Sequence, residues 1–229
     1  MKKITFLTLV LALSAFTTHA QYDVNVFNTE VRPNTSGMWV VTSNSGEEIE
    51  GNYRLYDNDF QKGIITTKEG KKFEIPALNY NIKADQLEAK ISKDSVFAFN
   101  TSSIVEVDFG KNKFKTLFDP KKYSPTFYEV IGSFNNQTVL KHRTVKVKPG
   151  IVNPMTQQKQ TPDRFVQEYA YFVTNEKGGL DELKLKKRTI LKLFDDSAEK
   201  VEDYASENDL SFKEDEDLKK LFKYYNKNS

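Results

Sequence analysis

The stretch "TFYEVIGSFNNQTVLKHRTVKV", residues 126–147, decides the predicted fold. Two runs rich in β-branched and aromatic residues, 126–134 and 138–147, flank the dipeptide Asn135-Asn136. Such runs favour strands, and asparagine tolerates the backbone angles of a tight turn. The stretch therefore predicts an antiparallel hairpin of two neighbouring strands.

The same alternation of apolar and polar residues recurs along most of the chain. Polar turn signals such as Glu69-Gly70 and Gly178-Gly179 separate the runs. The further strand-like runs are 38–43, 63–68, 103–109, 165–173 and 180–186. We predict a mainly β (α+β) protein: an antiparallel β-sandwich or barrel-like sheet of seven or more strands, with a small C-terminal helical segment.

The polar stretch "NYNIKADQLE", residues 79–88, predicts a corner rather than a single strand. Apolar residues fall on even positions over 78–84 and on odd positions over 87–91. A slip of one residue would turn the apolar face outward unless a bulge or turn absorbs it. We therefore place a bend at Asp85-Gln86, with Tyr80 either in the core or lining a cavity.

The periodicity changes to that of helices after residue 187. We expect a short helical turn over 189–194, a helix capped by Ser197, and a third helix that begins at a capping box. In this box, "SFKE" (211–214), Ser211 and Glu214 exchange side-chain to backbone hydrogen bonds. The apolar stripe of the third helix favours packing on the protein's own core, with partner docking as the alternative; it consists of Leu218, Leu221, Phe222 and Tyr225.

The N-terminus reads as a secretory signal peptide over residues 1–20. Lys2 and Lys3 precede an uncharged apolar run, 4–16, and small residues then predict cleavage before Gln21. The apolar run is shorter than the roughly 20 residues of a spanning helix, so we expect no integral membrane span after cleavage. The predicted domains are thus the signal peptide 1–20, a β-rich domain 21–187, and C-terminal helices 188–229 packed on it. The predicted location is periplasmic or extracellular.

Composition narrows the function classes. Without Lys2 and Lys3, 32 basic side chains face 32 acidic ones, so the mature chain is formally neutral and we expect no nucleic-acid partner. The absence of cysteine excludes disulfides, thiolate zinc sites and a cysteine nucleophile. An exported protein without disulfides is typical of the bacterial envelope. We expect no cofactor.

Catalytic constellations are sparse. His142 is the one histidine of the mature chain, which excludes histidine-rich metal sites, and no G-x-S-x-G motif accompanies it. We expect His142 on the surface of a strand. A cofactor-free glycan hydrolase needs only two carboxylates, and Asp85 with Glu88 or Asp57 with Asp59 could supply them. Local turns also explain such aspartates.

Two further features are candidates for ligand binding. Trp39 is the only tryptophan; flat rings bind sugars, but a tryptophan in an apolar strand favours the core. The connection 148–163 holds three prolines and links two strand-like runs. Loops of this length are usually functional or mobile, and both interpretations remain open. The candidate ligand-binding residues are Trp39, Tyr80, Asp85, Glu88 and His142.

Two stretches resemble a family of secreted proteins common in Bacteroidota that has no assigned activity. They are "FQKGIITTKEGKKFEIPALNYNIKADQLEAK" (60–90) and "LKLFDDSAEKVEDYASENDLSFKEDEDLKKLFKYYN" (191–226). The resemblance implies export and a shared architecture, and it assigns no functional residue.

The predicted function is a non-enzymatic binding or interaction protein of the bacterial envelope. Its partner would be an envelope protein or glycan whose identity the sequence does not give. One alternative is the glycan hydrolase with an Asp/Glu pair. The other is a structural accessory of an outer-membrane complex.

Overall fold

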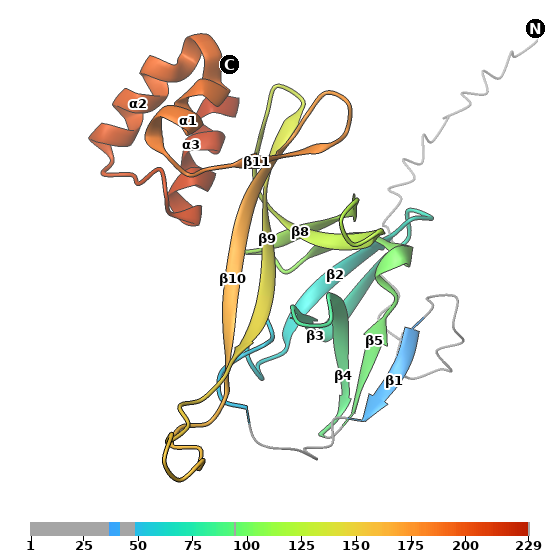
Figure 1. Ribbon diagram of the computed structural model, residues 1–229. Coiled ribbons are helices and arrows are strands. Elements are labelled where there is room, and N and C mark those ends of the chain that lie inside the picture. Colours follow the sequence, from blue (N-terminus) through green and yellow to red (C-terminus); the bar gives the residue numbers. More distant parts are fainter. Residues whose placement is uncertain (1–36, 42–48, 94, 229) are drawn as a thin grey trace, which may run out of the picture.

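The computed structural model describes residues 37–41, 49–93 and 95–228 (Figure 1). The predicted signal peptide, 1–20, lies outside the described residues. No helix among the described residues is both long enough and apolar enough to cross a membrane.

The described strands form one sheet whose neighbours all pair antiparallel, in the order β1-β5-β4-β3-β2-β6-β7-β8-β9-β10-β11. The predicted mainly β class is therefore confirmed, with eleven strands where seven or more were expected. The strands are β1 Gly37–Val41, β2 Gln61–Thr67, β3 Lys72–Asn81, β4 Gln86–Ser92, β5 Ser95–Phe99, β6 Ile104–Asp108, β7 Lys113–Asp119, β8 Ser124–Phe134, β9 Gln137–Lys148, β10 Arg164–Thr174 and β11 Leu180–Leu183.

The helices gather at one end of strands β8 to β11, where the chain also ends (Figure 1). They are α1 Lys187–Leu191, the 3-10 helix η2 Lys192–Ser197, α2 Ala198–Glu207 and α3 Asp215–Asn228; a short 3-10 helix, η1 Thr101–Ser103, precedes β6.

Two hydrophobic cores hold these elements together. The first gathers side chains of β2 to β8, and the ring of Tyr80 lies there with centroids 5.3 Å from Phe114 and 5.4 Å from Phe127. The second lies between the helices and β8 to β11. Tyr80 is only 1% exposed, so it belongs to the core and lines no open cavity.

The apolar stripe of α3 is buried in the second core, as the favoured interpretation expected. Phe222 stacks on Phe134 with centroids 5.7 Å apart, and lies 5.2 Å from Phe194. Gly132 of β8 permits this approach, because a Cβ there would stand 2.2 Å from the Phe222 ring.

The predicted capping box at α3 is wrong. The amide of Ser211 donates to Asp217 Oδ2 at 2.9 Å, and the Ser211 hydroxyl accepts from Lys213 at 3.2 Å. Because α3 begins at Asp215, the acid that reaches back lies in its first turn, three residues after Glu214. Ser197 does occupy the cap position of α2, but its side chain makes no capping hydrogen bond.

Strands β8 and β9 separate partway along their length. Their pairing ends at Glu129 and Lys141, whereas β9 stays paired with β10 as far as Lys148 and Arg164. Past that fork, β9 and β10 run on as a two-stranded ribbon, and the segment 149–163 forms its far end (Figure 1). Strands β9 and β10 thus have the helices near one end and this segment at the other.

Candidate functional site

Asp85 forms the corner between β3 and β4, as the slip in register predicted. Its φ of 55° is left-handed, a conformation that aspartate tolerates. Its Oδ1 accepts from the Tyr80 hydroxyl at 2.7 Å and from the backbone N–H of Phe127 at 3.3 Å. Phe127 lies on β8 just beyond the fork, where β9 no longer pairs with that edge. Asp85 therefore satisfies a backbone donor that the fork leaves open.

A small polar cluster surrounds this corner. Lys122 Nζ lies 3.8 Å from Asp85 Oδ2 and 3.4 Å from His142 Nε2. The half-buried His142 ring packs on Tyr128, with centroids 5.1 Å apart. The structure thus brings together three of the residues predicted from the sequence, Tyr80, Asp85 and His142.

The protonation of this cluster follows from its burial. Burial, together with the charge of Lys122, lowers the pKa of His142 below its usual value. A neutral His142 can accept a hydrogen bond from Lys122 through Nε2. Burial, with the charges of Asp119 and Asp85, raises the pKa of Tyr128 to about 12. No deprotonated tyrosine is available here near neutral pH.

Glu88 lies on the other face of the same strands. It stands opposite Asn79 in the register, while Leu87 stands opposite Tyr80. Since neighbouring strand residues point to opposite faces, Glu88 and Tyr80 are on different sides of the sheet. Glu88 is buried there: Oε2 accepts from Arg54 Nε at 2.8 Å and Oε1 from Asn81 Nδ2 at 2.6 Å.

Asp85 and Glu88 therefore do not form a catalytic pair. Asp85 is bonded on the Tyr80 side and Glu88 is held by Arg54 on the opposite side. Asp57 and Asp59 belong to a turn, and their carbonyls accept from Asn79 Nδ2 at 3.1 and 3.2 Å. Neither arrangement resembles the facing carboxylates that glycoside hydrolysis requires.

Trp39 is not a core residue, so the favoured interpretation was wrong. Its side chain is 60% exposed and touches Phe97 edge to face at 5.4 Å. It lies on β1, the edge strand of the sheet, where Met38 is exposed as well. An apolar run alone does not distinguish an edge strand from a central one, which explains the error.

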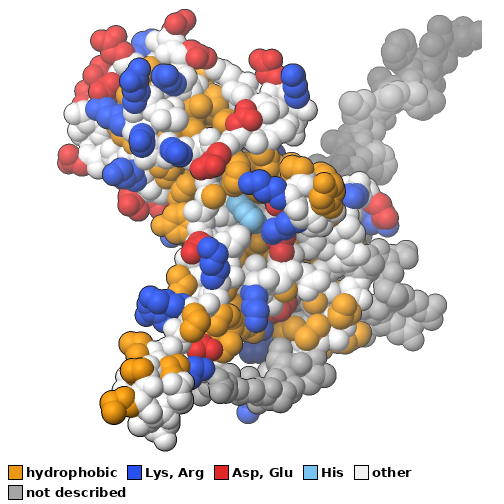
Figure 2. All heavy atoms as spheres, viewed as in Figure 1, with side chains coloured by type: hydrophobic (Ala, Val, Ile, Leu, Met, Phe, Trp, Pro, Cys, Tyr) orange, Lys and Arg blue, Asp and Glu red, His pale blue; other side chains and the backbone are white. Residues whose placement is uncertain are grey.

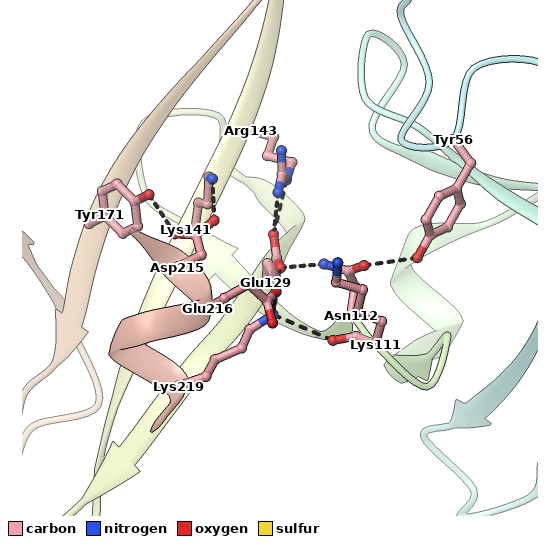
Figure 3. Close-up of polar contacts among 10 residues, drawn as sticks. All are labelled: Tyr56, Lys111, Asn112, Glu129, Lys141, Arg143, Tyr171, Asp215, Glu216 and Lys219. Atoms are coloured by element: carbon pink, nitrogen blue, oxygen red, sulfur yellow. Dashed lines mark hydrogen bonds and ion pairs between the residues drawn. The ribbon is translucent and has the colours of Figure 1, made fainter. Parts of the chain in front are cut away.

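The most extensively hydrogen-bonded group of side chains, which surrounds Glu129, was not identified from the sequence. Glu129 of β8 is fully buried, and Figure 3 shows the side chains that converge on it. Its Oε2 accepts from Arg143 Nε at 3.0 Å and Nη2 at 2.7 Å, and its Oε1 accepts from Asn112 Nδ2 at 2.6 Å. Tyr56 donates to Asn112 Oδ1 at 3.0 Å, and burial together with the charge of Glu129 raises the pKa of Tyr56 to about 12.

A second carboxylate joins the helices to the sheet beside Glu129. Asp215, the first residue of α3, accepts from Lys141 Nζ at 2.5 Å and from the Tyr171 hydroxyl at 2.6 Å (Figure 3). Lys219, one turn further along α3, lies 3.7 Å from Glu129 Oε1. These bonds link α3 to β8, β9 and β10. We interpret the group as a structural joint, because all four carboxylate oxygens of Glu129 and Asp215 accept hydrogen bonds from within the group.

The sequence did not indicate that the charged residues of this joint are buried. Glu129, Lys141 and Arg143 alternate along strands, a pattern that usually marks a solvated face. The helices cover that face, and the sequence does not reveal the cover. Within the described part of the chain, no cluster of three metal-ligating side chains exists.

An open groove of about 670 Å³ lies along the helices and is not a convincing small-molecule site. One of its cations, Lys187, is paired with Glu202 at 2.7 Å. The lining residues are Lys187, Arg188, Leu191, Lys192, Asp195, Ala198 and Glu202.

The segment 149–163 has hydrogen-bonded structure of its own. The amide of Gly150 donates to Asp163 Oδ1 at 2.7 Å, and that of Ile151 donates to Thr161 Oγ1 at 2.8 Å. An isolated antiparallel bridge joins Val152 and Lys159. The chain therefore doubles back as a small hairpin at the end of the ribbon.

The end of this hairpin exposes three apolar side chains, which we call the apolar tip: Ile151, Val152 and Met155. Their exposed fractions are 63%, 46% and 92%. Figure 2 shows them as the hydrophobic end of the ribbon, at the lower left of that view. Asn153 fixes the turn between them, since its Oδ1 accepts from the Met155 amide at 2.9 Å.

Comparison of the chain with protein-family models, with curated proteins and with solved structures finds no match. The resemblance to a Bacteroidota family therefore stays a prediction.

Proposed function

We propose that the protein is a secreted or periplasmic binding protein of the bacterial envelope that performs no catalysis and meets its partner through the apolar tip. The observation that carries the proposal is the exposure of Ile151, Val152 and Met155 on a hydrogen-bonded hairpin. Clustered exposed apolar side chains commonly mark an interaction site.

The order of the hairpin supports the same conclusion. A contact surface whose backbone is already fixed loses little conformational entropy on binding. Several backbone hydrogen bonds hold the hairpin, among them Asn153 N–H to the Gln158 carbonyl at 2.9 Å. None of the apolar tip is needed for either hydrophobic core.

The candidate carboxylates support a non-enzymatic function. Asp85 and Glu88 are each held by partners on opposite faces, and Glu129 and Asp215 are bonded within the joint. Bonds of this kind position elements of the fold.

Photo-crosslinking from the tip tests the proposal. Because the chain contains no cysteine, Met155→Cys can carry a benzophenone at a single place. We expect ultraviolet light to yield adducts with an envelope fraction from Met155→Cys. The matched control is Phe118→Cys on β7, where the native side chain is 60% exposed, and it should yield none.

A deletion of residues 150–161 completes the test. We expect the deleted protein to lose capture of the envelope component and to keep its melting temperature, since the deleted residues lie outside both cores. Equal adducts from both labelled positions, or capture by the deleted protein, would contradict the proposed function.

A further inference from the structure

We infer that the partner of the apolar tip is the surface of an anionic lipid bilayer, into which Ile151, Val152 and Met155 insert. The inference rests on the proposed function, because it takes the apolar tip as the contact surface. It differs from a membrane span, since only the end of the hairpin would enter the lipid.

The shape of the surface favours a bilayer over a protein groove. The apolar side chains lie on the end of a ribbon that runs past the fork, and Met155 is 92% exposed (Figures 1 and 2). A projecting end of this kind fits between lipid headgroups, where peripheral proteins bury apolar side chains to a depth of about 5–10 Å.

The backbone of the tip is prepared for a medium poor in water. Backbone groups that enter lipid need internal hydrogen bonds. The amide of Gln160 donates to the Ile151 carbonyl at 2.7 Å, and the amide of Gln157 donates to the Asn153 carbonyl at 2.9 Å. The exposed Gln157 and Gln158 side chains would keep the insertion shallow, at the level of the headgroups.

The charges behind the tip favour anionic lipid. The segment 146–164 contains four cationic residues and one acid, Asp163; the cations are Lys146, Lys148, Lys159 and Arg164. Lys148 and Arg164 face each other across the ribbon, and both are exposed. Lys148 stands three residues before Ile151, and Arg164 stands three residues after Thr161, whose side chain bonds the Ile151 amide; three residues span roughly 10 Å at the rise of a strand. That spacing would place both cations at the phosphates when the tip is inserted.

Two acids near the ribbon, Glu168 and Glu50, form no ion pair with Lys148 or Arg164. Glu168 lies further from the tip and is paired with Lys146 at 2.6 Å. Glu50 lies beside Arg164 through an isolated backbone bridge. Within the described part of the chain, neither Lys148 nor Arg164 forms an ion pair with a side chain.

Vesicle flotation tests the inference with the purified exported protein. We expect binding to vesicles of phosphatidylcholine with about 30% phosphatidylglycerol, and at least a tenfold weaker partition into pure phosphatidylcholine vesicles, since each cation near an anionic surface strengthens binding about fivefold. The combined change Lys148→Gln and Arg164→Gln should weaken the anionic partition about 30-fold. The matched control is Lys72→Gln, an exposed cation of β3, and it should leave the partition unchanged.

The apolar contribution has its own test. Met155→Asp should reduce the partition at least tenfold, whereas Phe118→Asp on the body should not change it. A fluorophore sensitive to polarity, attached at Met155→Cys, should shift to the blue with anionic vesicles, and one at Phe118→Cys should not.

The outcomes separate the inference from the proposed function. Absence of binding to anionic vesicles, or equal binding to neutral ones, would overturn the lipid inference. If the Met155→Cys crosslinker then captures a protein, the proposed function stands with a protein partner. If neither vesicles nor envelope components are captured at the tip, both conclusions fall.

Discussion

Glu129 shows how one residue can join two parts of a protein. Its carboxylate has no exposure to solvent and accepts hydrogen bonds at both oxygens, from Arg143 at one and Asn112 at the other. Two acceptor oxygens suit two donors. A glutamine side chain in the same place has one acceptor, its oxygen, and one donor, its NH₂ group. The NH₂ group would then face either Arg143 or Asn112, which are both donors, and no hydrogen bond could form there.

We therefore expect Glu129→Gln to lower the free energy of unfolding by about 3 kcal/mol, because it leaves Arg143 without its charged partner. Denaturation in urea measures the change. Glu106→Gln is the matched control: its ion pair with Lys113 at 3.7 Å is partly exposed to solvent, and its loss should cost under about 1 kcal/mol. Equal effects of the two variants would show that the joint contributes no more than a surface pair.

His142 makes stability depend on pH in a predictable direction. Its pKa in the folded protein lies below the usual value of 6.5, chiefly because of burial. As the pH falls below that value, the unfolded chain takes up the proton before the folded protein does. The contribution of His142 is therefore fully present above the unfolded pKa and is lost as the pH falls toward the folded pKa.

We expect the difference in unfolding free energy between the native protein and His142→Gln to shift against the native protein between pH 7.5 and pH 5. Parallel urea titrations at the two pH values measure this difference. A difference that stays constant across the window would mean that His142 is as readily protonated in the folded state as in the unfolded one.

At the scale of elements, the hairpin at the ribbon's end depends on Gly150. A Cβ at this position would stand 1.8 Å from the carbonyl oxygen of Thr161 and 2.8 Å from that of Pro162. Because both neighbours are backbone atoms, no side-chain rotation can relieve the clash. The two halves of the hairpin would have to move apart.

Gly150→Ala should therefore speed hydrogen exchange across residues 150–163 and change the global unfolding free energy by less than about 1 kcal/mol, since the hairpin contributes to neither core. Gln160→Ala, which keeps the backbone bond to Ile151, should leave exchange in the hairpin as it is. Unchanged exchange in Gly150→Ala would show that the hairpin adapts without opening.

The elements that the sequence predicted well are those with a strict period. The alternation over 126–134 and 138–147 corresponds to β8 and β9, and the slip in register near Asp85 corresponds to the corner between β3 and β4. Strands β5 and β7 were not among the predicted runs. Strand β5 has five residues, and its continuous apolar sequence "SVFAF" carries no clear alternation; β7, "KFKTLFD", has two adjacent apolar residues that break its alternation.

The candidate site shows the corresponding limit for side chains. Tyr80, Asp85 and His142 were selected as separate residues, and only the fold brings them to one corner. Glu88 lies three residues from Asp85 and still faces the other side. Burial of Glu129 depends on helices more than fifty residues away, a contact that no local pattern encodes.

For the whole molecule, the two cores predict two levels of cooperativity. The first core contains no helical residue, whereas the second depends on α3 through Phe222. Phe222→Ala would remove a ring that stacks on Phe134, at a cost of about 3–5 kcal/mol to that core.

We expect Phe222→Ala to lose helical circular dichroism at a lower temperature than it loses the sheet signal. In the native protein the two signals should disappear together, because the joint at Glu129 and Asp215 couples the cores. Tyr224→Ala is a control that also loses a stacked ring but lies at the margin of the second core. Coincident loss of both signals in Phe222→Ala would mean that the molecule unfolds as one unit even when that core is weakened.

The fork between β8 and β9 also determines how the molecule would bear mechanical load. The chain runs out to the ribbon's end along β9 and returns along β10, so a pull at that end is carried by two covalent backbones in parallel. The force then reaches the body through the β8–β9 ladder. Both strands leave that ladder at its Glu129–Lys141 end, β8 toward its pairing with β7 and β9 toward the ribbon, so a pull opens this pair first and proceeds one pair at a time toward the Asn135-Asn136 turn. The fork is therefore the point at which tension on the ribbon would begin to detach it from the sheet.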